Sequence, residues 1–291
     1  MQGRVYFYAV SAVVIWSTLA ALVKSLLTAI PTYEALFVSS LSGCLFLIIM
    51  QLVRGGGRVF RAYDVRGYAA MAGLGFLGIF LYSGLYYYGL SQLTSQEACI
   101  LNYLWPMMIV LFSALLLGEK VTVRTVAAPL LSFSGVVVLT LGGEGHAEGD
   151  ALLGTAACVT AALCYGLFCV LNKRQNMDQT VMMVMAWGVT ALCSLPVTLI
   201  MEEWTELSWM QWGGLLWLGI FIDAVGYLWW AMALQRAKNS AAVANLAYFV
   251  PLLSLVVSAL TLGEELSSAA LLALVLIMGG ILLQNMRRHE R

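Results

Sequence analysis

Long apolar segments alternate with short polar connections along almost the whole of this 291-residue chain. Each segment has about 20 residues, the length that an α-helix needs to cross the hydrocarbon core of a bilayer. The first segment is too long for the apolar core of a signal peptide, so we expect it to remain as a membrane span. The pattern predicts ten spans, at residues 5–28, 33–53, 67–89, 96–117, 124–142, 152–172, 180–201, 211–234, 241–262 and 267–286.

The charges of the connections follow the same alternation. Of the 15 Lys and Arg residues, 14 lie on alternate connections or near the ends of the chain, and Lys24 is the exception. The connections on the opposite side carry acidic residues such as Glu202, Glu203 and Glu206, without Lys or Arg. Because basic connections stay in the cytoplasm, both termini are expected to be cytoplasmic.

A stretch of 25 residues occurs twice, from Ser95 to Glu119 and from Ser240 to Glu264, at a constant offset of 145 residues. Ten of the 25 positions are identical, among them Tyr103 and Tyr248. The chain therefore consists of two related halves. Because each half has an odd number of predicted spans, the halves cross the bilayer in opposite directions, as in many secondary transporters.

The predicted fold is an all-α integral membrane protein with ten transmembrane helices, arranged as two inverted five-helix repeats around a central cavity. We expect the repeats at residues 1–143 and 151–291, the second with a short cytoplasmic tail. Composition agrees with the membrane class, because 62% of the residues are hydrophobic and only 10% are charged, far from the roughly 25% charged residues of a soluble domain.

The repeated residues resemble the EamA-type repeat of the drug/metabolite transporter (DMT) superfamily. Each half has the Ser, the Tyr, a Pro and a closing Ser-Ala-Leu-x-Leu-Gly-Glu run, which begins at Ser113 and at Ser258. The length and the aromatic-rich spans are similar to those of the bacterial aromatic amino-acid exporters. This resemblance implies an exporter of the bacterial inner (plasma) membrane, with a central cavity that opens alternately to each side.

Several aromatic side chains fall deep inside the predicted spans, where their polar tips need a hydrogen-bonding partner. A wet cavity would provide partners, and the rings would contact an aromatic substrate for about 0.5–1.5 kcal/mol per pair. Packing between helices is the alternative for any single ring, and Trp187 shares the same depth. The residues expected to line the cavity are Trp16, Tyr82, Tyr86, Asn102, Tyr103, Trp105, Tyr165, Tyr227, Asn245 and Tyr248.

The two amides in this set are uncharged at membrane depth. Asn102 and Asn245 can bind the amino or carboxylate group of an amino acid, or form interhelical hydrogen bonds worth about 0.6 kcal/mol. Pro106 and Pro251 lie near the middle of the fourth and ninth spans, where each removes a backbone donor and predicts a kink. These kinks have a role in gating or lining the cavity, or they are static kinks that the packing of the helices accommodates.

Ionisable residues inside the spans need separate interpretation. Asp223 lies near the centre of the eighth span, where a charge costs at least ~2.5 kcal/mol. It is a proton-coupling carboxylate, a binder of a substrate ammonium, or a protonated packing residue. Lys24 can extend to the interface, or form a symmetric salt bridge, since it matches Lys173 in the repeat. Glu97 opens the fourth helix, where its charge suits the helix dipole.

The sequence argues against catalysis and cofactors. The only histidines, His146 and His289, are expected outside the membrane on opposite sides, so no intramembrane histidine pair can bind a metal or transfer a proton. The six cysteines lie inside the spans without metal-ligand spacing and are interpreted as packing residues. We therefore expect no cofactor and no metal. A nucleic-acid partner is not expected either, since the basic residues are explained by topology and the net charge is zero.

The predicted function is export of aromatic amino acids and similar small amphipathic metabolites by alternating access. The alternative is an exporter of other metabolites or drugs, with proton coupling left open. Small multidrug-resistance relatives use a carboxylate in their first helix, but here that stretch reads Trp16-Ser17-Thr18, which argues against cation exchange by that route. The expected partners are a small-molecule substrate and the lipid bilayer, and we expect a functional monomer.

Overall fold

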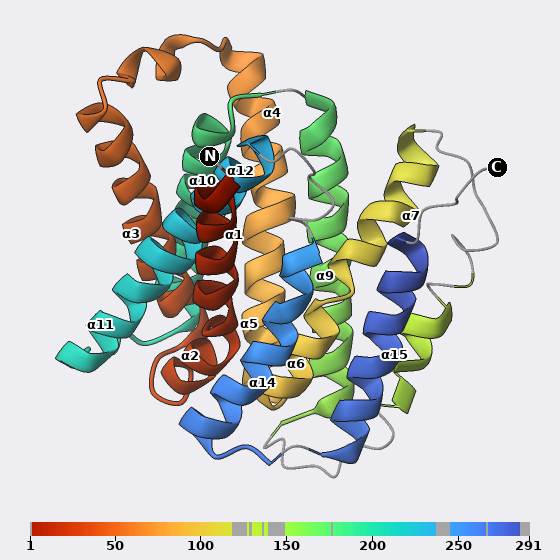
Figure 1. Ribbon diagram of the computed structural model, residues 1–291. Coiled ribbons are helices and arrows are strands. Elements are labelled where there is room, and N and C mark those ends of the chain that lie inside the picture. Colours follow the sequence, from red (N-terminus) through yellow and green to blue (C-terminus); the bar gives the residue numbers. More distant parts are fainter. Residues whose placement is uncertain are drawn as a thin grey trace, which may run out of the picture.

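The computed structural model describes residues 2–117, 127, 130–135, 137–138, 149–175, 177–236, 245–265 and 267–285. All regular elements in these ranges are helices (Figure 1). The first half contains α1 (Gln2–Ser17), α2 (Leu19–Leu26), α3 (Thr32–Val53), η1 (Gly57–Arg61), α4 (Val65–Gly75), η2 (Phe76–Leu81), α5 (Tyr82–Gln92), α6 (Ser95–Asn102) and α7 (Trp105–Leu117). The second half contains α9 (Ala151–Gln175), α10 (Gln179–Met201), α11 (Trp209–Leu216), η3 (Trp217–Gly226), α12 (Tyr227–Arg236), η4 (Asn245–Tyr248), α14 (Phe249–Leu262) and α15 (Ser268–Asn285).

Helices long and apolar enough to cross a membrane account for most of the described chain, which confirms the prediction of an all-helical membrane protein. Six such stretches coincide with the predicted spans one, two, three, six, seven and eight, and lie at Gly3–Leu26, Thr32–Val53, Val65–Gln92, Ala151–Asn172, Gln179–Met201 and Trp209–Trp230. Shorter apolar helices, Phe249–Leu262 and Ser268–Gly280, fall in the ninth and tenth. The fourth is divided between α6 and α7. Most of the fifth predicted span, 124–142, lies outside the described residues.

The outer surface of the bundle is apolar. Large side chains such as Leu192, Ile200, Leu260 and Val275 are exposed on it. Contiguous exposed apolar surface of this kind marks contact with lipid or a partner rather than with water. In a chain of this composition, the lipid bilayer is the natural environment of that surface.

Helices of one half pack along helices of the other. The pairs α3 with α10, α5 with α9 and α1 with α12 each join the two halves, and α5 and α9 run side by side through the bundle in Figure 1. Glycines permit the close approach. A methyl group on Gly75 of α4 would lie 2.6 Å from the Cα atom of Ala186 in α10, and one on Gly89 of α5 would collide with the Cys158 sulfur in α9.

The third and eighth spans each contain a stretch of π-helix, η2 and η3. Both stretches contain the sequence Leu-Gly-Ile-Phe, at Leu77–Phe80 and at Leu218–Phe221. π-Helical segments inside α-helices are rare and occur mostly at functional sites. The two halves therefore share an irregular segment at matching places in their sequences.

The fourth and ninth spans are interrupted before their prolines. Helix α6 ends at Asn102 and α7 begins at Trp105, so Pro106 is the second residue of α7. In the second half the 3₁₀ turn η4 precedes α14, of which Pro251 is the third residue. A proline in the first turn of a helix removes no needed donor. The expected bends are thus breaks in the helix just before each proline.

Hydrogen bonds to a glutamate join the halves at the lower end of the bundle in Figure 1, where α6 begins and α14 ends. The Glu264 carboxylate accepts from the backbone N–H of Ser95 at 2.8 Å, from the Ser95 hydroxyl at 2.9 Å and from the backbone N–H of Gln96 at 3.2 Å. A carboxylate at this position satisfies free N–H groups and suits the positive end of the helix dipole. The first turn of α6 is thus capped by a residue of the other half.

A second glutamate caps α3 in the same manner. The Glu202 carboxylate, just after α10, accepts from the backbone N–H groups of Tyr33 at 3.0 Å and Glu34 at 2.9 Å. The Glu34 carboxylate in turn accepts from the backbone N–H of Thr205 at 3.1 Å. Acidic residues predicted in the connections therefore tie the two halves together.

Candidate functional site

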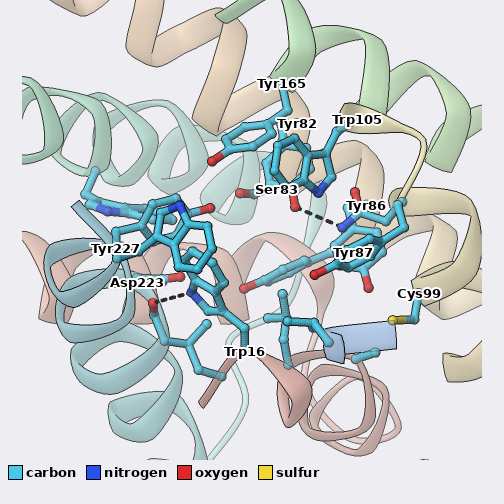
Figure 2. Close-up of a pocket in the computed structure, with 18 residues that line it drawn as sticks. Trp16, Tyr82, Ser83, Tyr86, Tyr87, Cys99, Trp105, Tyr165, Asp223 and Tyr227 are labelled. Atoms are coloured by element: carbon cyan, nitrogen blue, oxygen red, sulfur yellow. Dashed lines mark hydrogen bonds between the residues drawn. The ribbon is translucent and has the colours of Figure 1, made fainter. Parts of the chain in front are cut away.

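A cavity lies at the centre of the bundle, between helices of both halves (Figure 2). Its space for the centres of water molecules is about 80 Å³, several times the roughly 10–15 Å³ that one water needs. It can therefore be hydrated. The lining residues are Trp16, Leu19, Ala20, Tyr82, Ser83, Tyr86, Tyr87, Cys99, Asn102, Tyr103, Trp105, Tyr165, Trp187, Ile222, Asp223, Tyr227, Trp230 and Val250.

One group of aromatic rings surrounds Trp16 of α1. The ring centroid of Trp16 lies 5.3 Å from that of Tyr227 and 5.4 Å from that of Trp230, both in α12. Tyr227 also meets Trp187 of α10 edge to face, at 6.0 Å. These separations are typical of attractive aromatic pairs. The group therefore forms one continuous aromatic wall from three different helices.

A second group of rings surrounds Tyr165 of α9. Its centroid lies 4.8 Å from that of Tyr82 and 5.4 Å from that of Trp105, and the Trp105 and Tyr165 rings are nearly perpendicular, at 86°. Tyr82 and Tyr86, one turn apart in α5, are stacked at 6.1 Å. Figure 2 shows this group and the Trp16 and Tyr227 rings on different sides of the cavity.

Some polar tips of these rings have protein partners. The Asn102 side-chain amide donates to the Tyr82 hydroxyl at 3.1 Å, and the Tyr103 hydroxyl donates to the backbone carbonyl of Ala247 at 2.9 Å. The Trp16 indole N–H points to the carbonyl of Ile222 at 3.4 Å. The π-helical stretch η3 contains Ile222 and ends at Gly226. These bonds fix the orientation of rings on both sides of the cavity.

Other polar atoms of the lining are buried and have no partner in the described part of the chain. They are the Asn102 Oδ1 atom, the Asp223 Oδ2 atom and the Trp187 indole N–H. Asn102 is 6% exposed and Asp223 is 4% exposed. A buried polar group without a partner costs about 1–3 kcal/mol, more when charged. The site therefore offers two acceptors and one donor to a bound molecule or to water.

The structure brings most of the predicted site residues to this cavity. Eight of the predicted lining residues and Asp223 are on its wall. The side chains of Asn245, Tyr248 and Pro106 lie outside the described residues. Pro251 is buried in α14 and is not a lining residue.

Sequence reasoning missed part of the lining. Tyr87 and Trp230 stand next to other aromatic residues in the chain, so position within a span did not single them out. Trp187 was distinguished by its depth alone. Cys99 was interpreted only as a packing residue, but it lines the cavity, and all six cysteines are free thiols.

Lys24 and Glu97 are not among the residues that line the cavity. The Lys24 ammonium donates to the backbone carbonyl of Leu93 at 2.8 Å, while the side chain of its repeat partner Lys173 lies outside the described residues. Glu97 forms a capping box with Thr94 at the start of α6. Glu97 is thus structural, since reciprocal bonds of this kind satisfy the first donors of a helix.

Comparison with known proteins identifies the family. The model of the EamA-like transporter family matches residues 3–141 and again residues 152–286. The chain therefore belongs to the EamA-like transporter family, within the drug/metabolite transporters, and is a multi-pass membrane transporter. One solved structure, described as a crystal structure of a protein, has the same fold, with a TM-score of 0.69, 24% identity and coverage of 98% of this chain and 97% of that one.

Several curated relatives are similar over most of their length. The aromatic amino acid exporter YddG of Ancylobacter novellus is 28% identical over 273 residues, which is 93% of each chain. The uncharacterized transporter YvbV of Bacillus subtilis is 28% identical over 283 residues, 94% of this chain and 88% of the relative. A probable terminal-alkyne amino-acid exporter of Streptantibioticus cattleyicolor is 26% identical over 220 residues, 75% of this chain and 73% of the relative.

Proposed function

We propose that this transporter exports aromatic amino acids and similar small amphipathic metabolites by alternating access. The observation that carries this proposal is the cavity between the halves, with aromatic walls contributed by α1, α5, α7, α9, α10 and α12. An aromatic side chain enclosed by such rings gains about 0.5–1.5 kcal/mol per ring pair beyond the burial of its area. Two of the relatives are themselves named as exporters of amino acids.

The proposed architecture has ten spans in two inverted five-helix repeats, residues 1–143 and 151–291. Both termini are cytoplasmic, because the connections on their side carry the Lys and Arg residues. The proposed location is the bacterial inner membrane. The proposed functional unit is a monomer, in line with a cavity whose described lining residues come from helices of both halves of one chain.

The breaks before Pro106 and Pro251 are the proposed hinges. Both prolines follow an interruption in their spans and begin the regular helix beyond it. Interrupted backbone at membrane depth is tolerated where it is buried in protein or lines a cavity. Movement about such breaks would open the cavity to one side at a time.

The test is uptake of labelled phenylalanine, tyrosine, tryptophan and alanine into proteoliposomes, with and without a pH gradient. We expect saturable aromatic uptake that unlabelled aromatic amino acids suppress. Tyr165→Ala removes the ring at the centre of one wall and should lower aromatic uptake on the order of tenfold, which corresponds to the energy of one to three lost ring contacts. Trp209→Ala is the matched control, because Trp209 is 93% exposed at the start of α11.

The outcomes separate the candidate functions. An absence of aromatic uptake by a folded preparation would reject the aromatic substrate and leave only the transporter class. Asp223 favours a second candidate, a proton-coupled exporter of other metabolites or drugs, because it is a buried carboxylate on the cavity wall. That candidate requires uptake that depends on the gradient and becomes independent of it in Asp223→Asn.

A further inference from the structure

We propose that Asp223 and Asn102 form a subsite for a protonated amine. The transported class is then alkyl amines that carry an aromatic ring, and a carboxylate on the substrate is not required. This inference rests on the proposed function, because it assumes that the cavity is the substrate site. It goes further by naming the chemical group of the substrate that the protein recognises. Amino acids then bind mainly through their ammonium group and their aromatic ring.

The subsite has two hydrogen-bond acceptors that have no donor in the part of the chain that the structure describes. Asn102 Oδ1 and Asp223 Oδ2 both line the cavity, both are buried, and neither has a partner among the described residues. The Asn102 amide nitrogen is already bonded to the Tyr82 hydroxyl, which directs the amide oxygen elsewhere. An ammonium group carries three N–H donors and no acceptor. It therefore matches the groups that the cavity leaves unsatisfied.

The charges of the cavity favour a cation over an anion. Among the described residues that line the cavity, Asp223 is the only Asp or Glu, and none is Lys, Arg or His. A buried carboxylate stays ionised only beside an opposite charge, since desolvation of an isolated ion is costly. A bound amine supplies that charge. The carboxylate of an amino acid would find only neutral donors, such as the unpartnered Trp187 indole N–H, and would be repelled by Asp223.

The rings beside Asp223 strengthen the preference for a cation. Trp16 and Tyr227 approach each other at 5.3 Å, and Tyr227 meets Trp187 at 6.0 Å. Figure 2 shows Trp16 and Tyr227 on the same side of the cavity as Asp223. The faces of Trp and Tyr rings attract ammonium groups when water is excluded. The Asp223 carboxylate and the faces of these rings would thus both attract the ammonium group of the ligand.

The repeat shows that the fold does not require a carboxylate at this position. Aligning Leu77–Phe80 with Leu218–Phe221 matches Tyr86 with the identical Tyr227, and Tyr82 with Asp223. The first half fills the equivalent place with a tyrosine that accepts a hydrogen bond from Asn102. The acidic group breaks the symmetry of the repeat at the cavity wall. A role in binding explains why only one half carries it.

The test compares ligands that differ only in charged groups. Uptake of labelled tryptophan into proteoliposomes is measured against unlabelled tryptamine, which lacks the carboxylate, and indole-3-propionate, which lacks the amine. We expect tryptamine to inhibit at concentrations at least tenfold lower than indole-3-propionate. Asp223→Asn should reduce this ratio at least tenfold, and Asp223→Glu should retain the preference for the amine.

The matched control is Glu265→Gln, which removes an exposed carboxylate outside the lining and should leave the ratio unchanged. Equal inhibition by the two analogues of the wild type, or an unchanged ratio in a folded Asp223→Asn protein, would overturn the proposal. If Asp223 served only proton coupling, its substitution would change the response to a pH gradient but not the preference for the amine. Thermal unfolding of each variant in detergent checks that it is folded.

A failure of the proposed function is recognised separately. If the wild type does not transport tryptophan, calorimetric titration of the purified full chain with phenethylamine and with 3-phenylpropionate still tests the subsite. Binding of the amine alone, lost in Asp223→Asn, would support the amine subsite without the aromatic amino-acid assignment. Binding of neither compound, or of both equally, would reject it.

Discussion

At the scale of single residues, a glycine without a side chain allows two elements of the bundle to lie in close contact beside the cavity. Gly219 of η3 faces α3, and an added methyl group would collide with the Ser42 hydroxyl and the backbone carbonyl of Ser39. The backbone of η3 is therefore held close to α3. Because η3 also carries Ile222 and Asp223, this close contact fixes the depth of the subsite.

Gly219→Ala is expected to destabilise the protein by about 1–3 kcal/mol, because a methyl group forced into a packed contact displaces the backbone. The measurement is the thermal unfolding temperature in detergent. Gly213→Ala is the matched control, since Gly213 lies in the same span and has open space around its Cα atom. Equal unfolding temperatures for the two variants would show that α3 and η3 are not in close contact.

Residue depth within the spans predicted which rings would line the cavity, but neither which rings meet nor how their polar groups pair. Trp16 and Tyr165 were predicted to line the cavity because both lie well inside an apolar segment, and the structure places both there. The bond between Asn102 and Tyr82 could not be predicted. It depends on the placement of α6 against α5, and one sequence carries no information about that distance.

At the scale of elements, the irregular segments contain or directly adjoin residues that line the cavity. The stretches η2 and η3 interrupt the third and eighth spans, and breaks precede Pro106 and Pro251. The breaks near the prolines could be predicted from the sequence, because a proline lacks the backbone N–H donor that a regular helix needs at that residue. The π-helical stretches could not, because an extra residue in a turn leaves the hydrophobic pattern almost unchanged.

Pro251→Ala is expected to slow transport on the order of tenfold while leaving the unfolding temperature nearly unchanged. Alanine would allow the regular helix to continue across the break, and gating motions of this kind often limit turnover. Stability should change little, because a proline in the first turn costs the helix no hydrogen bond. Initial rates in proteoliposomes, at saturating and at low substrate concentrations, separate slower turnover from weaker binding.

The control for this experiment is Pro196→Ala. Pro196 is exposed and lies inside the continuous helix α10, so its replacement should not affect transport. A Pro251→Ala protein that transports at the wild-type rate would contradict the role of this break as a hinge.

At the scale of the whole molecule, orientation in the bilayer follows from the charges of the connections. The exposed Arg58 of η1 and the exposed Glu203 after α10 lie on connections of opposite type. We expect Glu203→Cys to react with a membrane-impermeant maleimide in intact cells, and Arg58→Cys to react only after permeabilisation. The wild type, with its six free thiols, gives the background. The reverse pattern would place the termini outside.

The membrane class could be predicted from composition, and the transporter family from the repeated residues. The joining of the halves by Glu264 and Glu202 could not. In the sequence, Glu202 is only an acidic group of a connection and Glu264 only the last residue of the repeated stretch. Capping of a helix by a residue far along the chain depends on which helix ends meet in space.

These long-range caps also impose an order on the maturation of the protein. Ser95 is synthesised 169 residues before Glu264, and Tyr33 is synthesised 169 residues before Glu202. While the first half leaves the ribosome, the backbone N–H groups that these two glutamates later accept from, at the starts of α3 and α6, have only water or the insertion machinery as partners. The first half therefore completes its hydrogen bonding only after the second half has been translated. A chain truncated between them keeps the local capping box of α6 but lacks the glutamates that bind the first N–H groups of α3 and α6.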